Sequence, residues 1–194
     1  MGFRGLFAVA GLLLLGNARA GEVTVKDVAG TRLTPLKIAG KAGVLFFIAS
    51  DCPISNSYAP KIQSICKEYG TKGVSCSLLY EDVALDSTAA KRHLTEYGYQ
   101  MTIPAAIDSE RKIANSVNAT VTPEAVILDA LGAVKYRGRI DDFYAGFGKT
   151  RREVSVHNVR DALDSILAGK PVAQPETKAW GCYIVSPEIM KRSK

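Results

Sequence analysis

The sequence predicts an α/β domain with a central sheet of mixed strand direction, flanked by helices. Strand-like and helical segments alternate from residue 44 to residue 118, and a hairpin followed by one more helix occupies residues 124–169. Such alternation is typical of parallel strands, whereas a hairpin joins strands that run in opposite directions. The continuously apolar segment VLFFIAS (44–50) indicates a central strand that is covered on both faces.

Residues 1–20 have the pattern of a secretory signal peptide. Arg4 precedes the apolar run LFAVAGLLLLG (6–16), and Ala18-Arg19-Ala20 is a small-x-small cleavage site. The run is shorter than the ~20 apolar residues that a membrane-spanning helix needs. We therefore expect an exported protein, periplasmic or secreted, with no stable membrane insertion after cleavage. An uncleaved N-terminal anchor is the alternative.

The first part of the exported chain predicts a hairpin, the buried strand and an amphipathic helix. Residues 22–43 contain short alternating runs that are interrupted by Gly30 and Pro35, which favours a small hairpin. Ser55 and Asn56 are capping residue types and mark the start of the helix. Its apolar stripe has helical spacing and comprises Tyr58, Ile62, Ile65, Cys66 and Tyr69.

The remaining elements follow from periodicity and from the turn residues between them. We predict strands at 74–80 and 101–108, helices at 87–98, 109–118 and 155–169, and a hairpin over 124–140. Prolines interrupt the chain after Gly169, so residues 170–194 are expected to form an extended arm. The chain thus divides into a signal peptide (1–20), one domain (21–169) and this arm.

Composition excludes several classes of function. The formal net charge is +6 over 194 residues and no long basic run is present, so no nucleic-acid partner is expected. The sequence contains no phosphate-binding loop, no Ser/His/Asp arrangement and no pair of catalytic carboxylates. We expect no cofactor.

Cys52 is the main candidate for chemistry. It lies between the strand at 44–50 and the helix that follows, and therefore at the carboxyl edge of the sheet, where α/β proteins place their sites. The unpaired amides and the positive dipole end of the first helical turn favour the thiolate, which is the nucleophilic form of cysteine. A buried cap residue without chemistry is the alternative.

Two of the other cysteines have settings typical of core residues. Cys66 lies on the apolar stripe of the helix, and Cys76 lies on the inner face of the strand at 74–80. A buried cysteine behaves as a small hydrophobic residue and lacks the electropositive setting that activates a thiol. We therefore predict that both pack in the core.

Cys182 differs because it lies on the extended arm. Trp180 and Tyr183 are its neighbours, and both side chains could anchor the arm to the domain. A flexible arm that carries one cysteine could bring a second thiol to Cys52. The alternatives are a free thiol in the tail and a bond between two chains.

Two segments together resemble the thioredoxin-like fold in its redoxin, or peroxiredoxin-like (AhpC/TSA), branch. They are VLFFIASDCPISNSYAPKIQSICKEY (44–69) and TVTPEAVILDALGAVKYRGRID (120–141), and the resemblance extends over residues 22–168. It implies that Cys52 is the nucleophile and that Pro123 is a cis-proline facing it. It also implies that an arginine, Arg139 or else Arg137, stabilises the thiolate.

The chain departs from this family pattern at two places. Thioredoxins carry C-x-x-C, whereas Ser55 occupies the second cysteine position here. Peroxiredoxins carry P-x-x-x-T-x-x-C, but Leu45 and Ala49 occupy the first two of these positions, so the threonine that would hold a peroxide oxygen is missing.

The resemblance and the residues together predict an exported thiol oxidoreductase. Cys52 attacks a peroxide or a disulfide substrate, Cys182 resolves the product, and an unidentified thiol reductant regenerates the enzyme. One alternative is a Cu(I) site formed by Cys52, Cys182 and His157, since thiolates suit Cu(I). His157 and His93 are expected at the surface and have no paired ligand spacing. The other alternative is a non-catalytic thioredoxin-like binding module.

Overall fold

The computed structural model describes residues 23–99 and 102–185. The predicted signal peptide and the last residues of the arm lie outside the described residues. Within this part of the chain, no helix has both the length and the apolar character needed to cross a bilayer.

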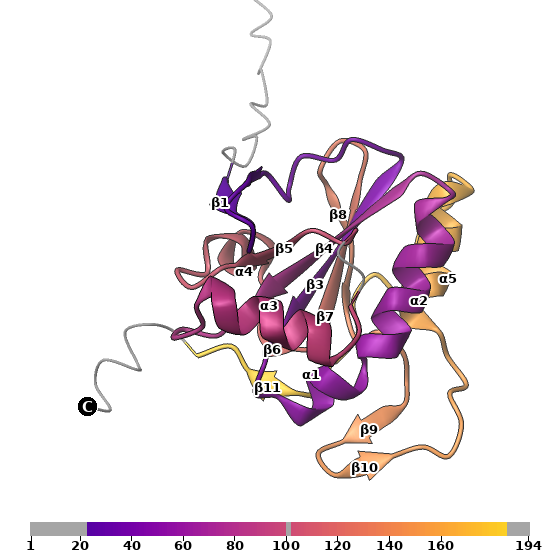
Figure 1. Cartoon of the computed structure of the whole chain (residues 1–194). Helices are drawn as coiled ribbons and strands as arrows, with labels where there is room; N and C mark the ends of the chain where they lie inside the picture. The colour runs from indigo at the N-terminus through magenta and orange to yellow at the C-terminus, as the bar shows by residue number, and fades with distance from the viewer. Residues whose placement is uncertain (1–22, 100–101, 186–194) are drawn as a thin grey trace, which may run out of the picture.

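A five-stranded sheet of mixed direction forms the centre of the fold (Figure 1). Its strand order is β5-β4-β3-β7-β8, in which β3, β4 and β5 are parallel and β7 and β8 are antiparallel to their neighbours. The strands are β3 (Ala42–Ile48), β4 (Val74–Tyr80), β5 (Ala105–Ile107), β7 (Glu124–Asp129) and β8 (Val134–Gly138). All residues of β3 are buried, which confirms the predicted central strand.

Two apolar clusters cover the two faces of this sheet. One cluster joins the sheet to α2 (Ala59–Gly70), α3 (Ser87–Glu96) and α5 (Asn158–Leu167). The other joins it to α4 (Lys112–Val117) and to the hairpin formed by β1 (Val25–Lys26) and β2 (Arg32–Leu33). Alternate residues of β3 enter different clusters, Phe46 the first and Phe47 the second, as the two-residue period of a strand requires. The predicted α/β architecture with flanking helices is therefore confirmed.

The helix after β3 begins earlier than predicted and is divided in two. α1 (Pro53–Ser57) and α2 meet at Tyr58, and Cys52 is the N-cap residue of α1. Ser55 and Asn56 lie inside α1, so their predicted role as caps is wrong. The division follows from Pro60, which has no N–H to donate to the carbonyl four residues earlier.

The described part of the C-terminal arm (170–185) is extended, as predicted, and lies along the domain. The N–H of Arg137 donates to the carbonyl of Pro175 at 2.9 Å, and the N–H of Thr177 donates to the carbonyl of Arg137 at 3.0 Å. Further along, β11 (Cys182–Tyr183) pairs antiparallel with β6 (Val121–Thr122). The arm is therefore held against the domain by backbone hydrogen bonds at two places.

Of the two aromatic residues beside Cys182, Trp180 packs against the domain and Tyr183 does not. Trp180 packs edge-on against Phe147, which lies between β9 (Tyr144–Gly146) and β10 (Lys149–Thr150), with 5.6 Å between ring centroids. Tyr183 is 72% exposed, so the expectation that it anchors the arm is wrong. The β9–β10 hairpin itself was not predicted, because its strands are too short to show an alternating pattern.

Cys66 and Cys76 form a disulfide that joins α2 to β4, with 5.8 Å between their Cα atoms. Both pack in the core as predicted, since Cys66 is only 9% exposed and Cys76 packs against the same cluster, but the disulfide between them was not predicted. The bond arises because the apolar stripe of α2 faces the strand that follows it. Two cysteines on facing sides of one interface then lie within bonding distance.

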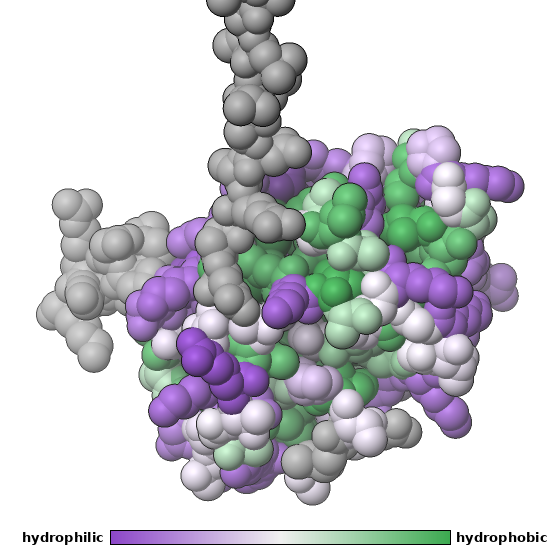
Figure 2. Space-filling model, turned by 90° about the horizontal axis from the view of Figure 1, so that it is seen from above, coloured by the Kyte–Doolittle hydropathy of each residue, from purple (hydrophilic) through white to green (hydrophobic). Residues whose placement is uncertain are grey.

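The end of the molecule that carries β1 has hydrophobic residues in the middle of its surface, with hydrophilic ones around them (Figure 2). This face lies at the opposite end of the sheet from α1 and β11 (Figure 1). The chemistry-bearing cysteines therefore lie at the other end, where β3 and β4 terminate.

Candidate active site

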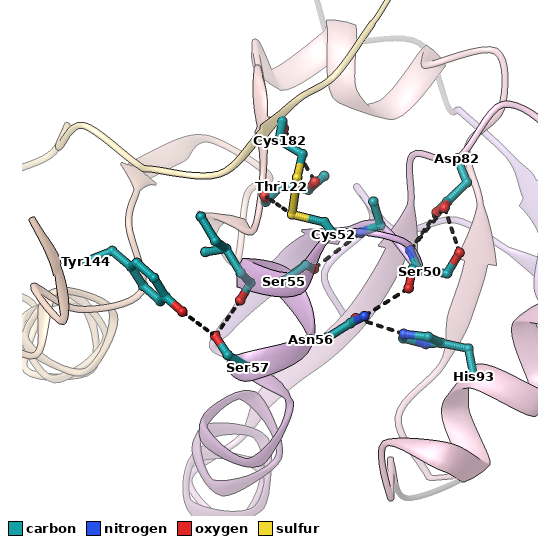
Figure 3. The surroundings of a disulfide bond; sticks show 12 residues. Ser50, Cys52, Ser55, Asn56, Ser57, Asp82, His93, Thr122, Tyr144 and Cys182 are labelled. Atoms are coloured by element: carbon teal, nitrogen blue, oxygen red, sulfur yellow. Dashed lines mark hydrogen bonds between the residues drawn. A yellow bond between two sulfur atoms is a disulfide. The ribbon is translucent and has the colours of Figure 1, made fainter. Parts of the chain in front are cut away.

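A disulfide joins Cys52 to Cys182, which are 130 residues apart in the sequence (Figure 3). The Cα atoms lie 6.1 Å apart, within the range of ordinary disulfides. Cys52 is completely buried at the start of α1, whereas Cys182 on β11 is half-buried. The structure thus brings together the two cysteines that the sequence singled out for chemistry.

The Thr122-Pro123 peptide bond is cis and lies beside this disulfide. Thr122 is the register partner of Cys182, and its carbonyl oxygen lies 3.2 Å from Sγ of Cys52. In the reduced protein, the thiol of Cys52 can donate a hydrogen bond to this oxygen. The structure therefore places the predicted cis-proline at the site, through the residue that precedes it.

Two side chains hold the loop between β3 and Cys52. Asp82, which follows β4, accepts hydrogen bonds from the N–H and the hydroxyl of Ser50 at 3.0 and 2.7 Å. Ser55 is buried, and its Oγ accepts a hydrogen bond from the N–H of Ala49 at 3.2 Å. Ser55 therefore replaces the second cysteine of a dithiol motif with a hydroxyl that supports the loop.

A second set of hydrogen bonds connects α1 to the core. Asn56 donates to the carbonyl of Ser50 at 2.9 Å, and its Oδ1 lies 2.9 Å from Nε2 of His93. Nδ1 of His93 lies 2.8 Å from the hydroxyl of Tyr80. These partners fit a neutral imidazole that donates through Nε2 and accepts at Nδ1. His93 is only 6% exposed, so its predicted surface position is wrong, and burial lowers the pKa of this imidazole.

The two arginines named from the sequence lie away from the sulfur atoms. Arg139 donates through Nε to Oδ1 of Asn158 at the start of α5, at 2.8 Å. Arg137 forms an ion pair with Glu176 of the arm, with 2.6 Å between Nη2 and Oε1. Among the described residues, no hydrogen bond or ion pair joins either arginine to Cys52 or Cys182.

The structure does not assemble the alternative metal site. His157 is exposed at the start of α5, and the two cysteines are bonded to each other. Over residues 23–99 and 102–185, no three side chains of His, Cys, Asp or Glu are grouped in a way that could hold a metal ion.

A pocket of about 500 Å³ borders the Cys182 side of the disulfide. Its walls come from the ends of β3 and β4, from Thr122 and from the arm, and they include Glu81 and Arg111. Sequence reasoning missed both of these residues. Glu81 could have been found, because it directly follows the predicted strand at 74–80 and so lies at the same sheet edge as Cys52. Arg111 has no such signal.

Glu81 and Arg111 are charged residue types without local partners. They are 5% and 4% exposed, and both carboxyl oxygens of Glu81 and Nε of Arg111 have no hydrogen-bond partner among the residues that the structure describes. Burial, together with the charge of Asp108, raises the pKa of Glu81 to about 9, while Arg111 acts in the opposite direction. Glu81 is therefore protonated at neutral pH, and a perturbed group in a pocket points to a functional site.

This pKa gives a prediction for the Glu81→Gln variant. An unfolded glutamate loses its proton near pH 4.5 but folded Glu81 keeps it to about pH 9, so wild-type stability falls as the pH rises through this interval. Glutamine removes that loss. We expect the variant to be more stable by about 1–3 kcal/mol at pH 7, and by much less at pH 4.5, in urea unfolding at both pH values. Equal gains at the two pH values would contradict the assignment.

Comparisons with known proteins identify a matching family and solved structures with a similar fold. The sequence model of the AhpC/TSA family matches residues 17–137. No curated protein is significantly similar in sequence to the chain. An uncharacterized conserved protein from Geobacillus kaustophilus is 26% identical with a TM-score of 0.73, covering 87% of this chain and 90% of that chain. A hypothetical protein from Sinorhizobium meliloti 1021 is 24% identical with a TM-score of 0.73, covering 86% and 91%.

A third solved structure carries a functional description. It is a secreted Mycobacterium tuberculosis disulfide oxidoreductase homologous to E. coli DsbE, and it is 18% identical to this chain. The TM-score is 0.52, with 76% of this chain and 96% of that chain covered. At this identity the likeness shows a shared thioredoxin-like fold.

Proposed function

The chain belongs to the AhpC/TSA family, and on this basis we propose that it is an exported thiol–disulfide oxidoreductase that cycles between the Cys52–Cys182 disulfide and the dithiol. One observation carries the proposal. Two cysteines 130 residues apart meet at the N-terminus of α1, beside a cis-proline.

The proposed reaction has two exchange steps. In the reduced protein, the thiolate of Cys52 attacks one sulfur of a substrate disulfide, and the other half of the substrate leaves as a thiolate. The thiolate of Cys182 then attacks Sγ of Cys52, the second half leaves, and the Cys52–Cys182 disulfide forms. The substrate gains two electrons and the protein loses two. A thiol reductant returns the protein to the dithiol.

Each site residue has a proposed part in this cycle. The N-terminal turn of α1 favours the thiolate of Cys52. Pro123 shapes the groove in which the substrate sulfur lies, because it cannot donate an N–H there. Arg139 contributes through its contact with Asn158, since among the described residues no hydrogen bond or ion pair joins it to Cys52 or Cys182.

A disulfide is the preferred substrate over a peroxide. Position 49 is an alanine whose N–H donates to Ser55, so it offers no hydroxyl to a peroxide oxygen. Peroxide oxidation of Cys52 to a sulfenic acid, followed by attack of Cys182 with loss of water, remains the second candidate because it ends in the same disulfide.

The proposed organisation is a signal peptide (1–20), a redoxin domain (21–169) and the arm (170–194). The apolar run of residues 6–16 supports export, and so does the description of the Mycobacterium tuberculosis structure as secreted. Export leads to an oxidising compartment, where the Cys66–Cys76 disulfide can persist as a structural bond.

The test is stoichiometric oxidation of the reduced, purified protein. We expect an equimolar small disulfide to produce the Cys52–Cys182 bond and to release two thiols per protein, as mapped by differential alkylation and mass spectrometry. Cys66 and Cys76 provide the internal control, since a structural bond should change little during the reaction. A Cys52 thiol that does not react with the disulfide or with hydrogen peroxide would exclude the enzyme and favour a binding module.

A further inference from the structure

The pocket beside Cys182 contains buried polar groups that the fold leaves unpaired. Glu81 and Arg111 line it and are each at most 5% exposed. Neither side chain forms a hydrogen bond or an ion pair with another described residue, and three of their buried polar atoms have no partner. Leaving such groups unpaired costs more free energy than an ordinary hydrogen bond contributes. A pocket that keeps them is therefore suited to a polar ligand.

The neighbouring acidic groups are already occupied. Asp82 accepts hydrogen bonds from Ser50, and Asp108 accepts two backbone N–H groups at the start of α4, at 2.8 and 2.9 Å. Asp51 is exposed at the rim. The guanidinium of Arg111 is thus the one cation among the described residues that line the pocket. Its natural partner is an anion that fits a buried, planar donor, and a carboxylate meets this requirement.

The other residues that line the pocket determine which cysteine of the disulfide such a ligand approaches. Apolar walls are formed by Val83, Ala84, Leu85, Ile184 and Val185, and Cys182 also lines the pocket. Cys52 does not line it and is completely buried. A ligand held at Arg111 therefore meets the disulfide from the side of Cys182.

We propose that this pocket binds a low-molecular-weight thiol that carries a carboxylate, and that this thiol is the reductant that attacks Cys182. This inference rests on the proposed function, because it names the class of reductant for the same disulfide. The carboxylate accepts hydrogen bonds from Arg111, and the aliphatic part lies against the apolar walls.

The exchange is balanced as follows. The ligand thiolate attacks Sγ of Cys182, a new S–S bond forms, and the bonding electron pair of the old disulfide leaves with Cys52 as a thiolate. A second ligand thiolate then attacks the ligand sulfur of this mixed disulfide, which releases the oxidised ligand dimer and the thiolate of Cys182. Two thiols are oxidised and one protein disulfide is reduced.

The test compares 3-mercaptopropionate, which carries the carboxylate, with the uncharged 2-mercaptoethanol. Reduction of the Cys52–Cys182 bond is followed at pH 7 in physiological salt by rapid alkylation. Each rate is divided by the rate at which the same thiol reduces a small uncharged disulfide. This corrected rate no longer depends on the difference in intrinsic reactivity between the two thiols. We expect the corrected rate to be at least about 10-fold higher for 3-mercaptopropionate. A 10-fold factor corresponds to about 1.4 kcal/mol, and a hydrogen bond to a charged group typically contributes at least this much free energy.

Substitutions of Arg111 test whether the preference for 3-mercaptopropionate over 2-mercaptoethanol arises in the pocket. Arg111→Gln should abolish the preference, so that the corrected rates of the two thiols become equal, and Arg111→Lys should keep part of the preference. Arg92→Gln, at an exposed site on α3, is the matched control for net charge and should keep all of it. Acid quenching during the reaction should place the ligand adduct on Cys182.

The outcomes separate the two proposals. Equal corrected rates for the two thiols in the wild-type protein, an unchanged preference in Arg111→Gln, or an adduct on Cys52 would overturn the reductant site alone. A Cys52–Cys182 bond that neither thiol reduces would instead overturn the proposed function.

Discussion

In a Cys182→Ser variant, Cys52 is expected to remain bonded to half of a disulfide substrate, and turnover is expected to fall by about 1000-fold or more. The reason is the position of Cys182, which the pairing of β11 with β6 holds opposite Cys52. An intramolecular nucleophile held in this way has an effective concentration far above that of any free thiol. Without it, only an external thiol can release the product. Non-reducing mass spectrometry of the variant should show the trapped adduct.

The Cys52→Ser variant is the matched control for this result. It should form no adduct with a disulfide substrate under the same conditions and should have no turnover, because its remaining site thiol lies on the arm. Both variants keep Cys66 and Cys76, so loss of the fold can be recognised by loss of that second disulfide. An adduct on Cys182 in Cys52→Ser, with turnover retained, would reverse the proposed roles.

The parts of the site that could be predicted lie in local patterns. Cys52 follows an apolar strand and precedes a helix, and this order alone places it at the sheet edge. The pair Thr122-Pro123 before a second apolar strand, together with the family resemblance, predicts the cis-proline. The sequence leaves the meeting of Cys52 and Cys182 as one of several alternatives, because no periodicity relates an arm to a strand 130 residues earlier.

The parts that could not be predicted depend on contacts between distant elements. Arg111 reaches the pocket from a left-handed backbone position before α4, with φ of 56°, which no residue pattern near it indicates. Ser55 and Asn56 have the chemistry of helix caps, but they instead bond Ala49 and His93 from inside α1. A single sequence records the capacity of these side chains for hydrogen bonds, and the tertiary fold decides which partner each one receives.

The Gly181→Ala variant should weaken the Cys52–Cys182 disulfide by about 10-fold to 100-fold in its equilibrium with a glutathione redox buffer. A Cβ atom at position 181 would overlap the carbonyl group of Thr122 and crowd the nitrogen of Pro123. These are backbone atoms of β6 and of the proline that follows it, and they cannot move aside as a flexible side chain would. Overpacking of this kind typically costs about 1–3 kcal/mol, which gives the expected factor.

The strain acts on the disulfide because Gly181 directly precedes Cys182. Relief of the overlap requires the arm to move away from β6, and a disulfide does not form when its Cα atoms are more than about 7 Å apart. Gly70→Ala is the matched control, since a Cβ atom there meets no other atom within 4 Å. The equilibrium constant between the disulfide and the glutathione buffer is measured for both variants by alkylating samples that have been equilibrated at a series of redox potentials. If Gly181→Ala and Gly70→Ala had the same constant, close contact between the arm and the cis-proline would not determine the stability of the disulfide.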